Sequence, residues 1–190
     1  MKTNKYLLLL AVLMLVILPL TAQQNADKAA TITNHYATRN FAAGTIPAAD
    51  LEIIVQAGIR APSARNLQPW HFTVVQNPVL TKKIIAGCDE GNVLIIVSAQ
   101  SDTKANNADV LDCALAVQSI YLAAQALGYG SRIYTGPVDN FNKNLKAEIT
   151  LPKGHSAVAI VRVGKIKEPA PDAVSAASRR KSASEVVTYK

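Results

Sequence analysis

Few residues in this 190-residue chain are suited to a metal centre or a disulfide framework. There are two cysteines, Cys88 and Cys113, and three scattered histidines, His35, His71 and His155. Two cysteines are too few for a disulfide scaffold, and nothing around them has the spacing of a metal site. We therefore expect no metal. The two cysteines either pair in an oxidising compartment or are separate buried thiols.

Aromatic residues are also scarce, at 5% of the chain, and the single tryptophan, Trp70, stands at the end of a polar segment. Residues 61–72 read APSARNLQPWHF. Two prolines restrict the backbone of this loop, which should therefore be stiff. A stiff loop with many hydrogen-bond donors suits recognition of a flat polar ligand. The alternative is that Asn66 and Gln68 tie down the loop's own backbone while Trp70 anchors it in the core.

A long apolar run without charge occupies residues 6–22, directly after two lysines. A positive start, an apolar stretch and a small residue at Ala22 form the layout of a secretory signal peptide. We therefore expect residues 1–22 to be removed, residues 23–190 to form one domain, and the protein to be exported to the periplasm. The alternative is an uncleaved anchor, because the run is about as short as a spanning helix can be. Membrane attachment is expected only through this segment.

Acidic residues are fewer than basic residues, and the whole chain carries a formal net charge of +7. Loss of Lys2 and Lys5 with the leader lowers the charge from +7 to +5. Much of the remaining excess lies near the C-terminus, in Lys165, Lys167, Arg179, Arg180, Lys181 and Lys190. A basic tail can indicate nucleic-acid binding. An exported chain rarely meets nucleic acid, however, so we expect a small anionic ligand or a solvated surface instead.

Hydrophobic periodicity predicts an α+β domain with mixed sheet order and a large central helix. We expect helices over residues 26–38, 47–58, 107–128 and 138–149, a short helix from Asn77-Pro78, and strands over residues 71–76, 93–97 and 157–163. Apolar residues in the long helix step by three and four, namely Val110, Ala114, Val117, Tyr121, Ala124 and Gly128. Residues 165–190 have little apolar sequence of their own, so this tail must pack on something else.

The loop APSARNLQPWHF closely resembles the signature loop of the nitroreductase family of FMN-dependent oxidoreductases. Three further segments match that family in the same order: HYATRNF at residues 35–41, the glycine-rich turn LGYGSRIYTG at residues 127–136, and a late Arg180 between Arg179 and Lys181. The resemblance runs from about residue 30 to the C-terminus. It implies an α+β sandwich whose central antiparallel or mixed sheet is flanked by helices. It also implies an intertwined homodimer with two FMN sites at the interface, in which residues 165–190 wrap the partner.

The same resemblance implies a site in which the flavin carries the chemistry and no side chain acts as a catalytic acid or base. Arg39 would stabilise negative charge near flavin N1 and O2, and Arg180 with Lys181 would bind the phosphate. A backbone N–H of Thr135 or Gly136 would lie within reach of N5, and the signature loop would approach from the neighbouring subunit. The expected FMN-binding residues are His35, Tyr36, Ala37, Arg39, Pro62, Ser63, Ala64, Arg65, Asn66, Gln68, Ile133, Tyr134, Thr135, Gly136, Arg180 and Lys181.

Three residues depart from the usual pattern of the family. His35 stands where the family usually has Arg, Ala37 replaces a hydroxyl residue, and Thr135 stands where some members have Glu. An imidazole beside a phosphate is charged only part of the time near neutral pH. We therefore expect FMN binding to be weaker and to tighten on mild acidification. A flat affinity between about pH 5.5 and 8 would contradict this expectation.

The expected function is therefore FMN-dependent reduction of small electron-poor organic substrates, such as nitroaromatics or quinones. Two alternatives stay open: a flavin-binding protein of the same fold with little or no turnover, and a secreted interaction domain without a cofactor. The family commonly takes electrons from NADH or NADPH, which are not expected outside the cytoplasm. The sequence thus specifies neither the electron donor nor the physiological substrate.

Overall fold

The computed structural model describes residues 29, 31–35, 37–100, 107–167 and 180–190. It divides into an N-terminal unit that ends at His35 and a second unit that begins at Tyr36. The expected leader lies outside the described residues, and of the expected first helix residues 29 and 31–33 are described as helical. Within the described ranges, no helix combines the length and the apolar character needed to cross a membrane.

The second unit contains short and long helices around one sheet. The helical elements are α2 (Ala48–Ile59), a 3₁₀ turn (Ala64–Asn66), α3 (Pro78–Ile84), α4 (Asn107–Ala126), α5 (Val138–Asn140), a π-helical turn (Phe141–Leu145), α6 (Lys146–Ile149) and α8 (Ala183–Val186). The strands are β1 (Phe41–Ala42), β2 (Trp70–Val75), β3 (Val93–Gln100), β4 (Gly130–Tyr134) and β5 (His155–Ile166). The α+β prediction is confirmed.

The long strand β5 organises the sheet. The strand order is β1-β5-β3-β2, and β4 pairs with β5 on the side of β5 opposite to β3. Every pairing among the described strands is antiparallel, so this part of the chain has an antiparallel rather than a mixed sheet. Strand β3 is buried from Val93 to Ala99 because it lies between β2 and β5 and is covered on both faces. Burial on both faces explains why its sequence is continuously apolar instead of alternating.

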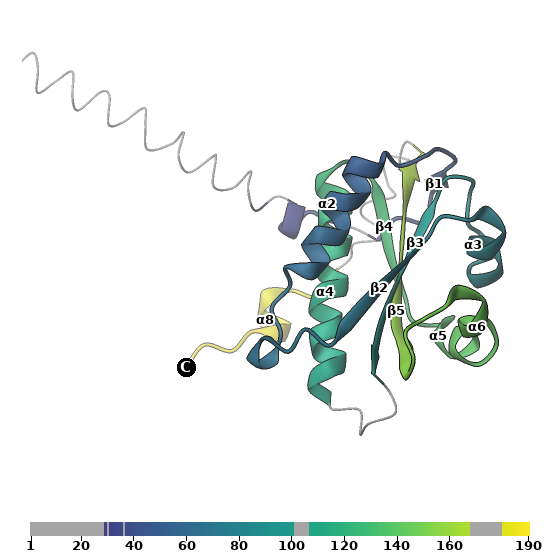
Figure 1. The fold of residues 1–190 in the computed structure, drawn as a ribbon. Coiled ribbons are helices and arrows are strands. Elements are labelled where there is room, and N and C mark those ends of the chain that lie inside the picture. The colour runs from purple at the N-terminus through teal and green to yellow at the C-terminus, as the bar shows by residue number, and fades with distance from the viewer. Residues whose placement is uncertain (1–28, 30, 36, 101–106, 168–179) are drawn as a thin grey trace, which may run out of the picture. The chain divides into compact units, whose positions relative to one another are not determined.

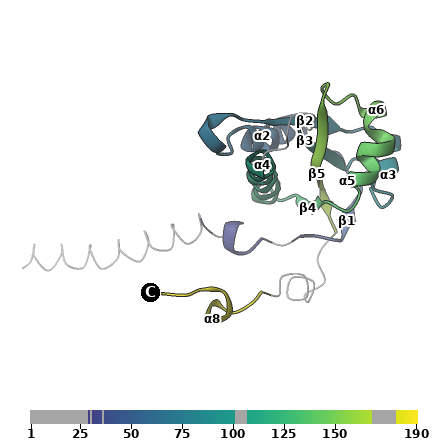
Figure 2. The same ribbon diagram turned by 90° about the horizontal axis from the view of Figure 1, so that it is seen from below.

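Helices cover both faces of the sheet. Figures 1 and 2 show α2 and α4 on one face and α3, α5 and α6 on the other. The core on the α4 side includes Ile54 and Ile120, and the core on the opposite side is built around Phe141 and Ile160. α2 packs closely on α4 at Gly58, where an added Cβ would lie 2.7 Å from Cγ1 of Ile120.

Several element boundaries differ from the prediction. Residues 130–134 carry no strand prediction, yet they form β4 by pairing with residues 160–164 of β5. A strand this short and mixed in polarity obtains its hydrogen bonds from a distant partner, which local periodicity does not reveal. α4 ends at Ala126, and Gly128 follows with the left-handed φ of 82° that glycine favours at a helix end. The helix expected over residues 138–149 is present but contains the π-helical turn.

The predicted apolar stripe of α4 is partly wrong. Val117, Tyr121 and Ala124 are buried as expected, but Val110 and Ala114 are exposed. The buried side instead continues through Cys113, Ala116 and Ile120. The error arises because α4 is apolar on two sides, so periodicity alone permits more than one stripe. Its second apolar side includes Leu111, which is 65% exposed, and Leu115, which is 41% exposed.

Candidate functional site

The signature loop before β2 has a partly left-handed backbone. Arg65, Asn66 and Gln68 have φ values of 50°, 56° and 48°. This region costs a residue other than glycine roughly 1–3 kcal/mol and persists where surrounding contacts enforce it. The Ser63 hydroxyl oxygen accepts the N–H of Gln68 at 3.0 Å, and the Gln68 amide donates to Oδ1 of Asn66 at 3.2 Å. These bonds agree with the alternative in which polar side chains tie down the loop itself, whereas Arg65 is exposed.

A buried carboxylate attaches this loop to α4. Both carboxylate oxygens of Asp112 accept the backbone N–H of Ala64, at 3.0 and 3.1 Å, and Asp112 is only 4% exposed. Sequence reasoning missed Asp112. The available signal was a charged residue on α4 one turn before Ala116, on the side of the helix that faces the core.

Trp70 fixes the other end of the loop. It is the first residue of β2, where it pairs with Ala99, and it packs partly buried against the core. Its ring stacks on Phe72, two residues further along the same face, with ring centroids 6.2 Å apart. The bulkiest side chain therefore follows the polar loop because it anchors that loop to the sheet.

Arg39 lies at the opposite edge of the sheet. It precedes β1, whose Phe41 pairs with Ile166 of β5. Thr38 is buried against β4, since a Cβ added to Gly130 would lie 2.6 Å from Cγ2 of Thr38. Arg39 itself is exposed, and neither of the ion pairs found among the described residues includes it. Its guanidinium is thus available to an anionic ligand.

A buried guanidinium holds the strand that follows Arg39. Arg162 of β5 is 5% exposed and donates from Nε to Oδ1 of Asn92 at 2.8 Å and from a terminal nitrogen to Oδ2 of Asp89 at 3.1 Å. Its guanidinium carbon lies 3.9 Å from the ring centroid of Phe41. The Asn92 amide donates in turn to the carbonyl of Ala42 at 3.0 Å. Sequence reasoning missed this network as well.

The predicted residues near the end of β4 divide by exposure. Ile133 and Tyr134 are partly buried, and Tyr134 is the last residue paired with β5. Thr135 and Gly136 follow it and are exposed. Their backbone N–H groups therefore lie beyond the sheet ladder, where a ligand could accept from them.

The remaining predicted residues lie in separate parts of the chain. His35 belongs to the N-terminal unit, where its Nδ1 donates to the carbonyl of Ile32 at 2.6 Å. Tyr36 lies outside the described residues, and Ala37 is exposed. Arg180 and Lys181 are exposed in the segment 180–190, just before the capping box that Ser182 and Glu185 form at α8.

A single chain does not gather the predicted residues of the second unit around one point. Asp112 lies beneath the signature loop, whereas Gln125 lines a hollow of about 120 Å³ together with Thr38, next to Arg39. These two residues of α4 are 13 positions apart (125 − 112), or about 20 Å along the helix axis. The end of β4 is separated from β2 by three strand spacings, about 14 Å. The loop and Arg39 therefore lie towards opposite ends of α4.

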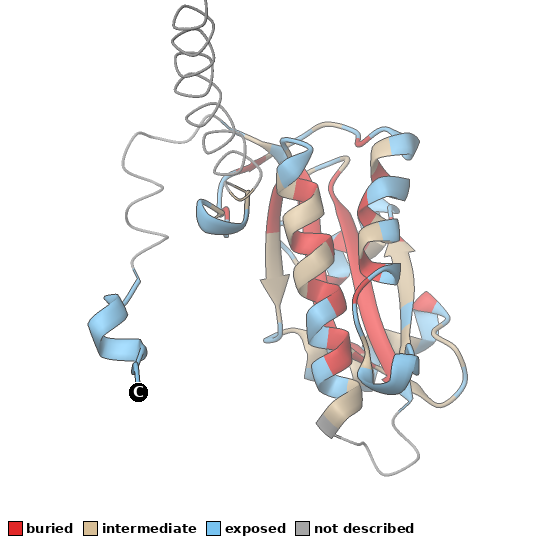
Figure 3. Cartoon of the chain, turned by 90° about the vertical axis from the view of Figure 1, so that its left-hand side faces the viewer, coloured by how far each residue is buried: buried red, intermediate tan, exposed pale blue. Residues whose placement is uncertain are grey.

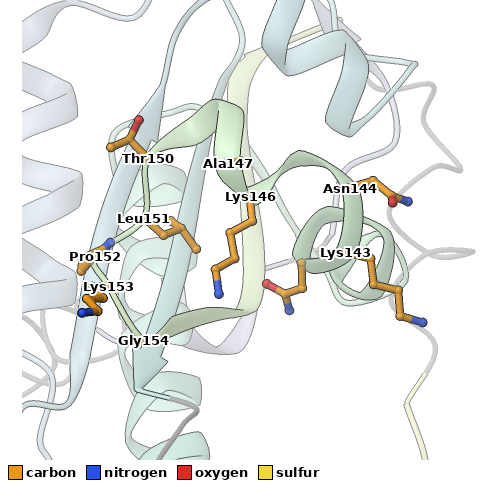
Figure 4. A pocket seen from close by; sticks show the side chains of 10 residues that line it. Lys143, Asn144, Lys146, Ala147, Thr150, Leu151, Pro152, Lys153 and Gly154 are labelled. Atoms are coloured by element: carbon orange, nitrogen blue, oxygen red, sulfur yellow. The ribbon is translucent and has the colours of Figure 1, made fainter.

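A larger hollow lies away from all of these residues. It has a volume of about 480 Å³ and is lined by Asn142, Lys143, Asn144, Lys146, Ala147, Thr150, Leu151, Pro152, Lys153 and Gly154. Figure 4 shows Lys146 pointing into it between the helical turn and the loop before β5. The hollow is basic, but it contains none of the predicted site residues, so the candidate site is not assigned to it.

Cys88 and Cys113 are free thiols, each buried in the second unit. Burial raises the pKa of Cys113 to about 12, with further contributions from the negative charges of Asp109 and Asp112. Burial also raises the pKa of Cys88, although the positive charge of Arg162 opposes the shift. Of the two readings left open by the sequence, separate buried thiols is the one that agrees with these positions. Clusters of three or more potential metal ligands are absent from the described ranges.

Comparison with known proteins decides the family. Residues 32–91 and 80–165 match the model of the nitroreductase family. The chain belongs to the nitroreductase family. A protein of Archaeoglobus fulgidus named "Putative NADH dehydrogenase/NAD(P)H nitroreductase" is 34% identical over 129 residues, which cover 63% of this chain and 74% of the relative. A protein of Methanothermobacter thermautotrophicus with the same name is 29% identical over 147 residues, covering 73% of this chain and 76% of the relative.

Solved structures show the same nitroreductase fold. A nitroreductase with bound FMN from Desulfitobacterium hafniense superposes with a TM-score of 0.68 at 23% identity, over 84% of this chain and 96% of that one. A nitroreductase with bound FMN from Bacteroides fragilis gives a TM-score of 0.69, with the same identity and the same coverage. The family match includes Arg39, the signature loop and β4, but it ends before Arg180 and Lys181.

Proposed function

We propose that this nitroreductase-family protein is an FMN-dependent oxidoreductase that reduces small electron-poor organic compounds, such as nitroaromatics or quinones. The observation that carries the proposal is the family match across residues 32–165, which includes an exposed Arg39 and a strained signature loop. Two neighbours of the same fold are described with bound FMN, and the archaeal relatives are named for NAD(P)H nitroreductase activity.

The residues present fit FMN. Arg39 is an exposed cation that forms no ion pair within the described residues, so it suits the negative charge that develops near flavin N1 and O2. Thr135 and Gly136 offer backbone N–H groups beyond the sheet ladder. Arg180 and Lys181 are exposed cations suited to a phosphate. Bound FMN would supply the electron-transfer chemistry, while the protein binds, orients and tunes it.

We further propose that the active species is a homodimer with two composite sites. Support comes from the split of the predicted residues between opposite ends of α4, because a second chain could bring its signature loop to Arg39 of the first. Support also comes from α2 and α4, along which Figure 3 shows exposed positions. The exposed apolar side chains of these helices include Ile53, Leu111 and Leu115. Exposed apolar patches of this kind often mark interaction surfaces, and a two-fold interface would create two equal sites.

We propose export as well, with residues 1–22 as the cleaved leader and the periplasm as the destination. The support is the layout of charge and hydrophobicity at the N-terminus. The electron donor would then be a reductant available outside the cytoplasm. The mass of the mature protein recovered from a cell fractionation tests this: a full-length chain retained in the cytoplasm would contradict it.

The flavin proposal is tested on purified protein. We expect a yellow dimer whose released ligand is FMN and whose photoreduced flavin is rapidly reoxidised by a nitroaromatic or a quinone. Photoreduced flavin that persists with both acceptors would favour the alternative of a flavin-binding protein with little or no turnover, which the departures at His35, Ala37 and Thr135 support. A colourless monomer that takes up no added FMN would overturn both.

A further inference from the structure

We propose that Asp112 is a positioning residue for the cofactor site, whose buried carboxylate holds the signature loop in its ligand-binding conformation. The inference rests on the proposed FMN site and assigns a role to a residue that lies outside the loop itself. Asp112 acts through Ala64, 48 positions earlier in the chain, and its role does not require it to touch the flavin.

The position of Asp112 is an unusual one for a carboxylate. It is 4% exposed, and its neighbours on the buried side of α4 include Cys113 and Ala116, both 0% exposed. Among the described residues, the hydrogen bonds of its carboxylate go to a single donor, the backbone N–H of Ala64. Neither ion pair in the same part of the chain includes it. Burying a charge with so few partners is costly, so packing alone would favour an apolar residue here.

The loop needs an external attachment. Between residues 62 and 69, the other hydrogen bonds in the described structure are local: Ser63 bonds to Gln68, Gln68 to Asn66, and the N–H groups of Asn66 and Leu67 to carbonyls three residues earlier. These bonds stabilise the loop's shape without connecting it to the rest of the domain. The Ala64–Asp112 pair connects it to α4, while Trp70 holds its far end.

This attachment matters for binding because the loop's backbone is unfavourable on its own. Arg65, Asn66 and Gln68 have left-handed φ values that residues other than glycine leave unless they are held. Without Asp112, the free loop would populate other conformations, and a ligand would have to reorder it on binding. Ligand affinity should therefore fall, while the sheet and the two helical layers stay intact.

Three variants separate this role from a general loss of charge. D112A removes the acceptor, and D112N keeps one oxygen acceptor in a side chain of similar size. D109A removes a charge from the same helix at a residue that, among the described residues, is not hydrogen-bonded to the loop. Two properties are measured: amide exchange at Ala64 by NMR in FMN-free protein, and the dissociation constant of FMN by titration of its fluorescence. A thermal unfolding scan checks that each variant is folded.

We expect D112A to accelerate exchange at Ala64 and to weaken FMN binding by about tenfold or more, as loss of a hydrogen bond to a charged group implies. In D112N, the exchange rate at Ala64 and the dissociation constant of FMN should stay close to the wild-type values. In D109A, both should match the wild type. If D112A does not fold, D112S replaces it, since a shorter side chain also cannot reach Ala64.

Two results would overturn the inference: unchanged exchange and affinity in D112A, or a D112N variant as impaired as D112A. Failure of the proposed function looks different. A wild-type protein that binds no FMN would remove the flavin role, whereas exchange at Ala64 in the FMN-free variants would still show whether the carboxylate holds the loop.

Discussion

Each of the two segments that we assign to the cofactor is held by a buried ionic side chain. The two side chains have opposite charges, and the one near Arg39 has more partners than the one beneath the signature loop. Beside Arg39, the guanidinium of Arg162 binds Asn92 and Asp89 and packs on Phe41, and Asn92 also reaches the strand that Phe41 begins. At the other end of α4, the hydrogen bonds that join the signature loop to that helix among the described residues all go to the carboxylate of Asp112.

The difference follows from the chemistry of the two ions and from the elements that they join. A guanidinium presents five N–H donors, so burying it requires several acceptors, and these bind several segments together. Arg162 lies on the long strand at the centre of the sheet, where its partners also stabilise the fold. Asp112 supports a surface loop. Breaking the first anchor should therefore reduce stability, whereas breaking the second should mainly change binding.

The largest effect should come from Asn92→Ala. The substitution leaves Nε of buried Arg162 and the carbonyl of Ala42 without their partner. Because an unsatisfied buried polar group is expensive, and a charged one more so, we expect the free energy of unfolding to fall by about 3 kcal/mol in urea titrations. Asn144→Ala is the matched control, since Asn144 is exposed and bonds to Asn140 of the neighbouring turn. Equal, small losses in both variants would show that the Arg162 network does not stabilise the sheet edge.

Gly130→Ala tests how tightly the Arg39 segment is packed. The added Cβ would collide with Cγ2 of Ile166 and lie 2.6 Å from Cγ2 of Thr38. Overpacking of this kind costs about 2 kcal/mol, and here it should also displace the residue before Arg39. Gly87→Ala serves as the control because a Cβ there meets nothing within 4 Å. If differential scanning calorimetry found the two variants equally stable, the sheet edge around Gly130 would accommodate the added methyl group without strain.

Arg39→Gln should affect the cofactor without affecting the fold. Arg39 is exposed, so the free energy of unfolding should change by less than about 0.5 kcal/mol. Loss of its charge should weaken FMN binding by about tenfold and make the flavin harder to reduce, by about 30 mV for a two-electron couple. Arg39→Lys keeps the charge, so its FMN affinity and midpoint potential should lie between those of the wild type and those of Arg39→Gln. An unchanged midpoint potential in Arg39→Gln would place the cation away from the flavin.

The sequence predicted those elements whose signals are local. α2 and α4 show helical periodicity, and β3 shows the apolar run of a covered strand, so their existence and type were correct. β4 was missed because its hydrogen bonds come from β5, about 30 positions later. The buried side of α4 was partly misassigned because Leu111 and Leu115 make a second apolar side.

The same distinction applies to the candidate site. The signature loop was found because its residues are contiguous, and Arg39 because a motif surrounds it. Asp112 and Arg162 were missed because each is a single polar residue whose partner lies far along the chain, 48 positions away for Ala64 and 70 for Asn92. The hydrophobic periodicity of the sequence does not indicate a hydrogen-bonded pair so far apart in the chain. Residues proposed to touch a ligand can thus be predicted from motifs, whereas the residues that hold them in place are identified only in the fold.

The smallest effect concerns the contact that joins α2 to the chain just after α4, at the Arg39 end. The Tyr129 hydroxyl donates to Oδ2 of Asp50 at 2.5 Å. This hydrogen bond, with burial and the charge of Asp50, raises the pKa of Tyr129 to about 12. Because the folded pKa lies above the unfolded value of about 10, the stabilisation is complete below pH 10 and is lost as pH rises towards 12.

We therefore expect Tyr129→Phe to lower the free energy of unfolding by about 1 kcal/mol at neutral pH, a modest value because the pair is partly exposed and screened by solvent. The gap between wild type and variant should close between pH 10 and 12 in urea titrations. Tyr189→Phe is the control, since Tyr189 is 90% exposed. A gap that persisted at pH 12 would mean that the stabilisation does not depend on the proton of the Tyr129 hydroxyl. The absence of a gap at neutral pH would mean that the ring, which phenylalanine retains, holds this end of α2, leaving the Arg162 network as the polar anchor near Arg39.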